Sequence, residues 1–297
     1  MKAKNNTIKP SITTEGLKKL RHPEYLLLGI GTGAIAIHMT LVWKSGNSSL
    51  LGTSFLFWMA VCSLIWERRD KLNLTSDLFS SLIGISLIAL LLLKSLAMNS
   101  FAGFLYISPF LYGLSIGLLA SGWRGIKQYS GELLALLSLG APTLLPFWIK
   151  NIAPLTAKMS AFMLWYTGFD VERHGVYIYL PGGSIEVASG CSGIELIFQM
   201  LGLSLIFLIM FPQKWQQKII LPTVAALLGF LVNGVRVAVM AVLVANSNGA
   251  AKVLEYWHHG DGSLIFSTIC VSLFGLFCWC ILNQSETNNQ NTKSSSR

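Results

Sequence analysis

The sequence predicts an all-α integral membrane protein with about eight transmembrane helices and a small extracytoplasmic β-hairpin before the sixth of them. Hydrophobic residues make up 53% of the 297 residues, charged residues only 12%, and the mean hydropathy is +0.59. A soluble domain carries about twice this charged fraction. Several apolar runs reach roughly 18 residues, which is enough for a helix to cross the hydrocarbon core of a bilayer.

Eight apolar segments are the predicted spans. The second is short, and the fifth contains Pro142 and Pro146, so the hydropathy pattern defines their ends least well. The eight segments are Tyr25–Trp43, Leu50–Trp66, Leu78–Leu96, Phe101–Ala120, Gly131–Ile149, Ile194–Phe211, Ile219–Val244 and Leu264–Leu282.

The spans define one polytopic membrane domain, residues 25–282, with a polar segment on either side. The N-terminal segment 1–24 is basic and has neither the apolar stretch nor the small-residue cleavage site of a signal peptide. The tail 283–297 is polar and low in complexity, so we expect it to be disordered.

The net charge of +9 fits membrane topology better than nucleic-acid binding. If alternate loops face the cytoplasm, beginning with the N-terminus, the cytoplasmic segments hold 15 Lys and Arg residues and the outer segments hold 6. This asymmetry is the positive-inside pattern. It predicts a multi-pass protein of the inner (plasma) membrane, in contact with anionic lipid, with both termini in the cytoplasm.

The long outer loop 150–190 differs from the other connections. Val171–Leu180 is rich in β-forming residues, Pro181–Ser184 is a turn signal, and Ser184–Val187 is typical of a returning strand. Upstream, Leu155–Tyr166 is predicted to form an interfacial helix. The first four spans, by contrast, contain His38 as their main polar group, so we expect scaffold or a lateral docking surface there, with His38 a hydrogen-bonding partner inside the bundle.

Cys191 is the one cysteine of five that lies outside the predicted spans. It sits in a glycine-flanked turn, Gly190-Cys-Ser-Gly193, directly before the sixth span. The N-terminal end of a helix has unpaired N–H groups and a positive dipole, which favour a thiolate. We therefore expect a reactive thiol that faces water at the membrane surface.

Two further polar groups are predicted to lie near Cys191. Arg236 is 17 residues beyond Ile219, the cytoplasmic start of the seventh span, which at helical rise is about 26 Å across a core of roughly 30 Å. An arginine inside a span is costly and usually functional. Asn233 lies on the same helical face. His258 belongs to the outer loop before the eighth span, so all these groups fall at similar depth.

A Cys-His-Arg set is suited to covalent catalysis. Histidine can take the thiol proton and return a proton to a leaving amine, while Arg236 can stabilise the thiolate or an oxyanion. The backbone N–H groups of Ser192 and Gly193 are candidate oxyanion donors. Glu195 is either a partner of Arg236 or a solvated carboxylate at a helix start.

These motifs resemble those of the exosortase/archaeosortase family. The similarity lies in Gly190-Cys-Ser-Gly-Ile194, Asn233-Gly-Val-Arg236 and His258-x-x-x-Gly262, and the string 255–266 is most similar to the cyanobacterial branch, the cyanoexosortases. The resemblance implies a membrane cysteine peptidase or transpeptidase (a thiol protease) acting on exported, membrane-anchored proteins with a C-terminal PEP-CTERM-type sorting signal. It implies Cys191 as nucleophile, Arg236 as catalytic arginine and His258, rather than its neighbour His259, as catalytic histidine, with the active site on the extracytoplasmic side.

Three other functions compete with this one. A transporter or channel could bind an anion at Arg236, but such proteins often contain inverted repeats, and none is visible here. A metal-dependent hydrolase could use His258, His259 and Asp261, although adjacent histidines point apart on a helix and no His-x-x-x-His spacing exists. A non-enzymatic assembly factor is the third. The sequence implies no cofactor or metal.

Overall fold

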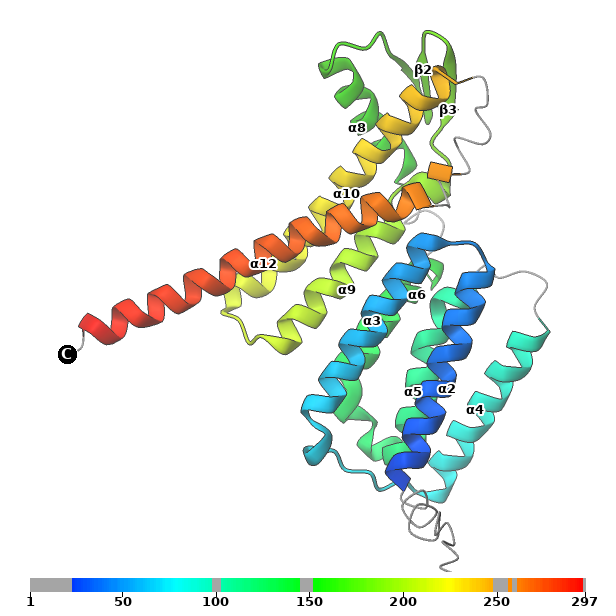
Figure 1. Ribbon diagram of the computed structural model, residues 1–297, viewed down its shortest axis with the longest axis vertical. Helices are drawn as coiled ribbons and strands as arrows, with labels where there is room; N and C mark the ends of the chain where they lie inside the picture. Colours follow the sequence, from blue (N-terminus) through cyan, green and yellow to red (C-terminus); the bar gives the residue numbers. More distant parts are fainter. Residues whose placement is uncertain (1–22, 98–102, 145–151, 248–255, 258–260, 296–297) are drawn as a thin grey trace, which may run out of the picture.

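The structure of the protein is a computed structural model that describes residues 23–97, 103–144, 152–247, 256–257 and 261–295. Its helices form two groups (Figure 1). In the first group α5 is central, since it packs against α2, α4 and α6. The members of this group are α2 (Pro23–Lys44), α3 (Ser48–Glu67), α4 (Leu78–Leu96), α5 (Phe104–Gly125) and α6 (Ser130–Leu144).

The second group contains the predicted catalytic motifs. Its helices are α8 (Ala153–Tyr166), α9 (Ile194–Met210), α10 (Trp215–Ala245) and α12 (Asp261–Ser295). Helix α9 joins the two groups because it packs against α6 on one side and α10 on the other. A second junction is the contact between α3 and α12.

The predicted membrane architecture is confirmed. Within the described residues, seven helical stretches are long and apolar enough to cross a membrane. The fourth of these, Phe104–Leu144, is 41 residues long and contains both α5 and α6. It bends back at Gly122, where φ is +65°, and at the short helix η2 (Ile126–Tyr129), so that α5 and α6 pack against each other. These two helices correspond to the fourth and fifth predicted spans.

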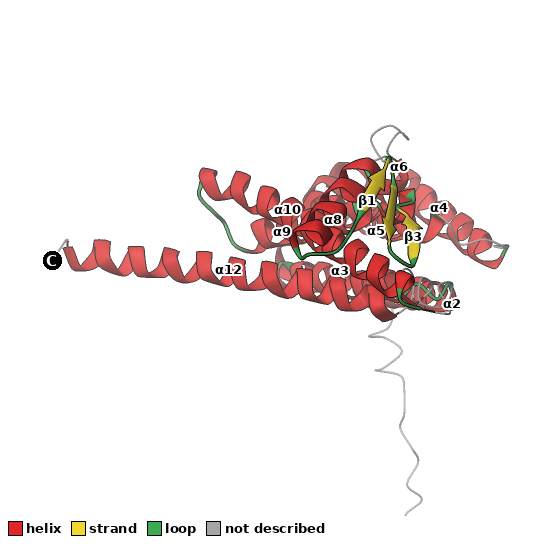
Figure 2. Ribbon diagram, turned by 90° about the horizontal axis from the view of Figure 1, so that it is seen from above, coloured by secondary structure: helices red, strands yellow, loops and turns green. Residues whose placement is uncertain are grey.

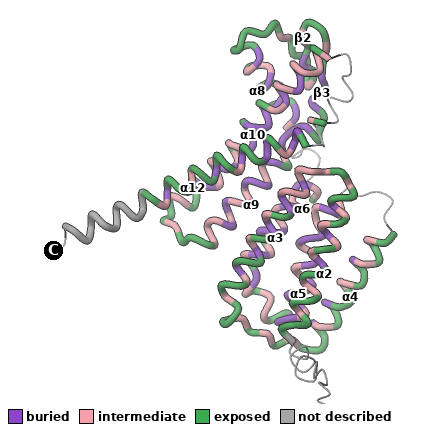
Figure 3. Tube along the Cα trace, in the orientation of Figure 1, coloured by how far each residue is buried: buried purple, intermediate pink, exposed green. Residues whose placement is uncertain are grey.

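Burial is greatest in the central helices (Figure 3). In the most apolar 18-residue stretch of each helix, 50% is buried in α10 and in Phe104–Leu144, against 17% in α2 and in α4. Helix α12 contacts α3 and α10 and then extends away from the other helices (Figure 2). Helix α12 is described as far as Ser295, and the disorder of the tail 283–297 stays a prediction. No proline or glycine follows Gly275, so each added residue can extend the hydrogen-bond ladder.

The segment between α6 and α9 folds, in its described part, into a helix and a three-stranded antiparallel sheet. The strands are β1 (Glu172–His174), β2 (Tyr177–Leu180) and β3 (Gly183–Glu186), in the order β1-β2-β3. The predicted single hairpin is thus one strand short, because Gly175, at φ +63°, turns the chain within the segment expected to be continuous. Ile178 and Ile185 face each other across β2 and β3, and both are buried. The sheet packs on α8 and α10, above the end of α10 that carries Arg236.

The buried histidine of the first helix group is paired with two serines of neighbouring helices. His38 of α2 is fully buried and makes hydrogen bonds with Ser108 of α5 at 3.1 Å and Ser54 of α3 at 3.2 Å. It is therefore the bundle hydrogen-bonder that the sequence predicts. A polar side chain without such partners would be costly in hydrocarbon.

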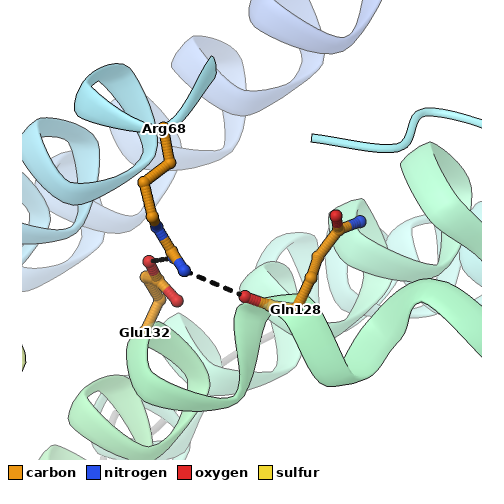
Figure 4. Close-up of polar contacts among 3 residues, drawn as sticks. All are labelled: Arg68, Gln128 and Glu132. Atoms are coloured by element: carbon orange, nitrogen blue, oxygen red, sulfur yellow. Dashed lines mark hydrogen bonds and ion pairs between the residues drawn. The ribbon is translucent and has the colours of Figure 1, made fainter. Parts of the chain in front are cut away.

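An ion pair closes the opposite end of this group (Figure 4). The Arg68 guanidinium, at the end of α3, contacts the Glu132 carboxylate in the first turn of α6 and donates to the carbonyl oxygen of Gln128 at 3.4 Å. The Glu132 side chain is only 3% exposed, whereas that of Arg68 is 39% exposed. Arg68 thus neutralises a carboxylate that water cannot reach.

Replacement of Arg68 by alanine should destabilise the protein, since it leaves Glu132 buried without its partner. We expect a loss of about 1–3 kcal/mol, measured by thermal or denaturant unfolding in detergent. Arg69→Ala is the matched control, because Arg69 pairs with Asp70 at 3.8 Å on an exposed surface. Equal stability of the two variants would contradict a structural role for the Arg68–Glu132 pair.

Candidate active site

The turn that holds Cys191 has a defined backbone. Residues Ser189–Cys191 form the short helix η3, in which the Cys191 N–H donates to the Ala188 carbonyl at 2.9 Å. Gly193 follows at φ +90° and is the N-cap of α9. A side chain at this position would be strained, and its Cβ would lie 2.6 Å from Asn233 Nδ2. Glycine is therefore required both by the backbone and by the neighbouring helix.

Asn233 connects this turn to α10. Its amide Nδ2 donates to the Cys191 carbonyl at 2.9 Å, and its side chain is fully buried. Helix α8 secures the same region, since the Thr156 hydroxyl donates to the Ser192 carbonyl at 2.7 Å. The backbone around the predicted nucleophile is thus fixed by side chains from two other helices.

The thiol itself is buried, which corrects the expectation that it faces water. Cys191 is 5% exposed and belongs to an apolar cluster that covers it with the sheet, α8 and α10. The sequence could not show this, because many of the covering residues come from α8 and the sheet, and their position depends on how the sheet folds back. Neighbours in the cluster include Ile185, Val187, Val237 and Ala238.

Arg236 lies one helical turn beyond Asn233, as the spacing predicts, and is half-buried. Its Nε donates to the Trp257 carbonyl at 3.3 Å. The guanidinium is also close enough to interact electrostatically with the Cys191 thiol and the Glu195 carboxylate. Trp257 directly precedes His258 in the chain, whereas His258 and His259 themselves lie outside the described residues.

Glu195 has a partner that sequence reasoning missed. Its carboxylate accepts a hydrogen bond from the Tyr106 hydroxyl of α5 at 3.1 Å. Glu195 also interacts electrostatically with Arg236, in line with one of the two alternatives that the sequence left open. The only sequence signal for Tyr106 is a phenol near the N-terminal end of the fourth predicted span, and hydropathy alone cannot show which way it points.

A polar cavity of about 90 Å³ lies between the two helix groups. Gly190 and Gly193 line it on either side of Cys191, which itself does not. Buried groups nearby keep unused hydrogen-bonding capacity, since Ser192 Oγ and Asn233 Oδ1 have no partner among the described residues. The charged and amide-bearing residues of the cavity wall are Asn47, Glu195, Gln199, Asn233 and Arg236.

The candidate oxyanion donors differ in availability. The Ser192 N–H already donates to the Ser189 carbonyl, at 3.3 Å, near the long end of the hydrogen-bond range. Gly193 gives α9 no side-chain cap, and helices leave their first N–H groups without intrahelical acceptors. The start of α9 forms part of the cavity wall.

The family model of transmembrane exosortases (Exosortase_EpsH) matches residues 43–275 of the chain. The chain belongs to the transmembrane exosortase family. The match includes the Cys191, Arg236 and His258 motifs and also α3 to α6, for which the sequence showed similarity in hydropathy alone. No curated protein and no solved structure matches the chain. The assignment to the cyanobacterial branch stays a prediction.

Gly193→Ala should destabilise this exosortase by more than the backbone strain of a positive φ alone would. Gly168 is the matched control, because its φ is +91° but a Cβ added there would have no other atom within 4 Å. We expect Gly168→Ala to lose about 1–2 kcal/mol and Gly193→Ala to lose more, through its clash with Asn233. The measurement is the unfolding midpoint of the purified proteins in detergent, and equal midpoints would argue against the close contact.

Proposed function

We propose that this exosortase is a membrane-embedded cysteine peptidase or transpeptidase that cleaves exported proteins carrying a C-terminal PEP-CTERM-type signal, through a thioester on Cys191. The observation that carries the proposal is the hydrogen bond from Asn233 to the Cys191 carbonyl. It joins the Gly190-Cys-Ser-Gly turn to the helix of Arg236, so two motifs that are 42 residues apart in the sequence meet in space.

The reaction begins with transfer of the Cys191 thiol proton to His258. The sulfur then attacks the carbonyl carbon of the scissile peptide bond and forms a C–S bond, giving a tetrahedral intermediate. When the C–N bond breaks, the protonated histidine gives its proton to the leaving amine. Water or an amine then attacks the thioester carbonyl, and its proton restores the thiol as the acyl group leaves.

Arg236 supplies the positive charge for this sequence of steps. Its guanidinium interacts electrostatically with the Cys191 thiol and is held at Nε by the Trp257 carbonyl. A charge fixed before the reaction stabilises a thiolate or an oxyanion without the cost of reorganisation. Gly193, at the uncapped start of α9, offers a backbone N–H as a second donor.

The proposed substrates are membrane-anchored, as the enzyme is. We place the protein in the inner (plasma) membrane with both termini in the cytoplasm, because the basic residues are concentrated in alternate loops. The same assignment puts Cys191, Arg236 and the sheet on the extracytoplasmic side. An exported protein held by a C-terminal apolar helix presents its signal at this depth.

Cys191→Ala should abolish cleavage of a co-expressed reporter that carries a Pro-Glu-Pro motif, an apolar helix and a basic cluster at its C-terminus. Cys270→Ala is the matched control, since Cys270 is also a buried free cysteine, but on α12. Cleavage is followed by the change in reporter size, with equal amounts of enzyme in the membranes. Cleavage by Cys191→Ala at the wild-type rate would exclude cysteine catalysis.

The assignment of His258 as the catalytic histidine predicts a difference in cleavage between its alanine variant and that of His259. His258→Ala should lose cleavage as completely as Cys191→Ala, and His259→Ala should retain most of it. A coupled cysteine and histidine should also give the wild type a bell-shaped pH–rate profile. If only His259→Ala is inactive, the role passes to His259, and if both variants are active, the Cys-His mechanism is wrong.

A further inference from the structure

The first turn of α3 is polar and reaches the second helix group. The Ser48 hydroxyl donates to Asp261 Oδ1 at 2.9 Å, and the Ser49 and Ser267 hydroxyls are 2.9 Å apart. Both partners lie in the first two turns of α12. The outer ends of α3 and α12 are thus joined by hydrogen bonds, where the two helices meet in Figure 1.

Asn47 extends this contact to α9. As the N-cap of α3, its Oδ1 accepts the Leu50 N–H at 2.9 Å, which fixes the orientation of the amide. Its Nδ2 then donates to the Tyr106 hydroxyl at 3.2 Å, and that hydroxyl donates to Glu195 Oε2 at 3.1 Å. A chain of hydrogen bonds therefore runs from α3 through α5 to the first turn of α9.

These contacts end beside the proposed catalytic groups. Glu195 follows Cys191 by four residues and shares the cavity wall with Arg236. Asp261 immediately follows residues 258–260, and Trp257 immediately precedes them. The described residues on both sides of the histidine segment are therefore held, Trp257 by Arg236 and Asp261 by Ser48.

We propose that Asn47, Ser48 and Tyr106 are positioning residues for the catalytic set, so that the first helix group completes the active site. The inference rests on the proposed function of Cys191, Arg236 and His258. Tyr106 holds the Glu195 carboxylate near Arg236, and Ser48 fixes the start of α12, three residues after His258 in the sequence. Groups acting in a reaction must be held to a fraction of an ångström, and a displacement of about 1 Å can cost on the order of 100-fold in rate.

The test uses full-length enzyme in liposomes and the Pro-Glu-Pro reporter, with initial rates measured over a range of reporter concentrations. Tyr106→Phe and Ser48→Ala should each lower kcat by about 10-fold or more, with KM changed by less than about 2-fold. The double variant Tyr106→Phe/Glu195→Gln should be no slower than the slower single variant, because both changes break the same link.

Matched controls separate positioning from general destabilisation. Tyr112 lies on α5, as Tyr106 does, and its buried hydroxyl has no hydrogen-bond partner among the described residues, so Tyr112→Phe removes a hydroxyl without breaking a hydrogen bond there. Ser63→Ala removes an exposed hydroxyl from α3. Both should keep the wild-type kcat. Wild-type kcat in Tyr106→Phe and Ser48→Ala would overturn the proposal, as would an equal loss in the two controls.

Failure of the positioning inference can be distinguished from failure of the proposed function. Cys191→Ala is run in the same liposomes, and its loss of cleavage shows that the cysteine mechanism holds. If Cys191→Ala is inactive while Tyr106→Phe and Ser48→Ala are fully active, only the positioning inference fails. If Cys191→Ala cleaves the reporter, the proposed function fails first.

Discussion

The hydrogen bond from Asn233 to the Cys191 carbonyl is the contact on which the arrangement of the site depends. It is buried, and a buried amide or carbonyl left unpaired would be costly. The contact is possible only because Gly193 has no side chain and adopts a positive φ. The two sequence motifs are therefore complementary in shape as well as in polarity, since the glycine of one makes room for the asparagine of the other.

Sequence patterns predicted the spans and the proximity of Cys191, Asn233 and Arg236. Both follow from the order of apolar and polar segments along the chain. Apolar length gives the helices, and the alternation of loops gives the end at which each polar group lies. The direct partners could not be predicted in this way. The hydrogen bond from Tyr106 to Glu195 depends on the rotation of α5 and α9 about their axes, which hydropathy does not define.

The loop between α6 and α9 shows the same limit in another form. Its strands and its helix were recognisable from β-forming residues, turn signals and interfacial aromatics, whereas the third strand and the burial of Cys191 were not. Both depend on tertiary contacts: the sheet packs on α8 and α10, and its apolar face covers the thiol. Whether a cysteine next to a helix start is exposed or buried thus depends on whether another segment packs over it. The residues around the cysteine in the sequence do not show this.

The relative depth of the two motifs is set by a packing contact one helical turn below them. A Cβ at Gly229 of α10 would lie 3.0 Å from the Cα of Ile197 of α9, so the two backbones are in close contact there. Gly229 is four residues before Asn233, and Ile197 is four residues after Gly193. Small residues allow membrane helices to approach closely, and that approach carries much of the association between helices in lipid. Once Gly229 is seated on Ile197, the next turn of each helix must bring Asn233 to Gly193. The same rigid pair then carries Arg236, three residues further along α10, to the level of the cysteine turn.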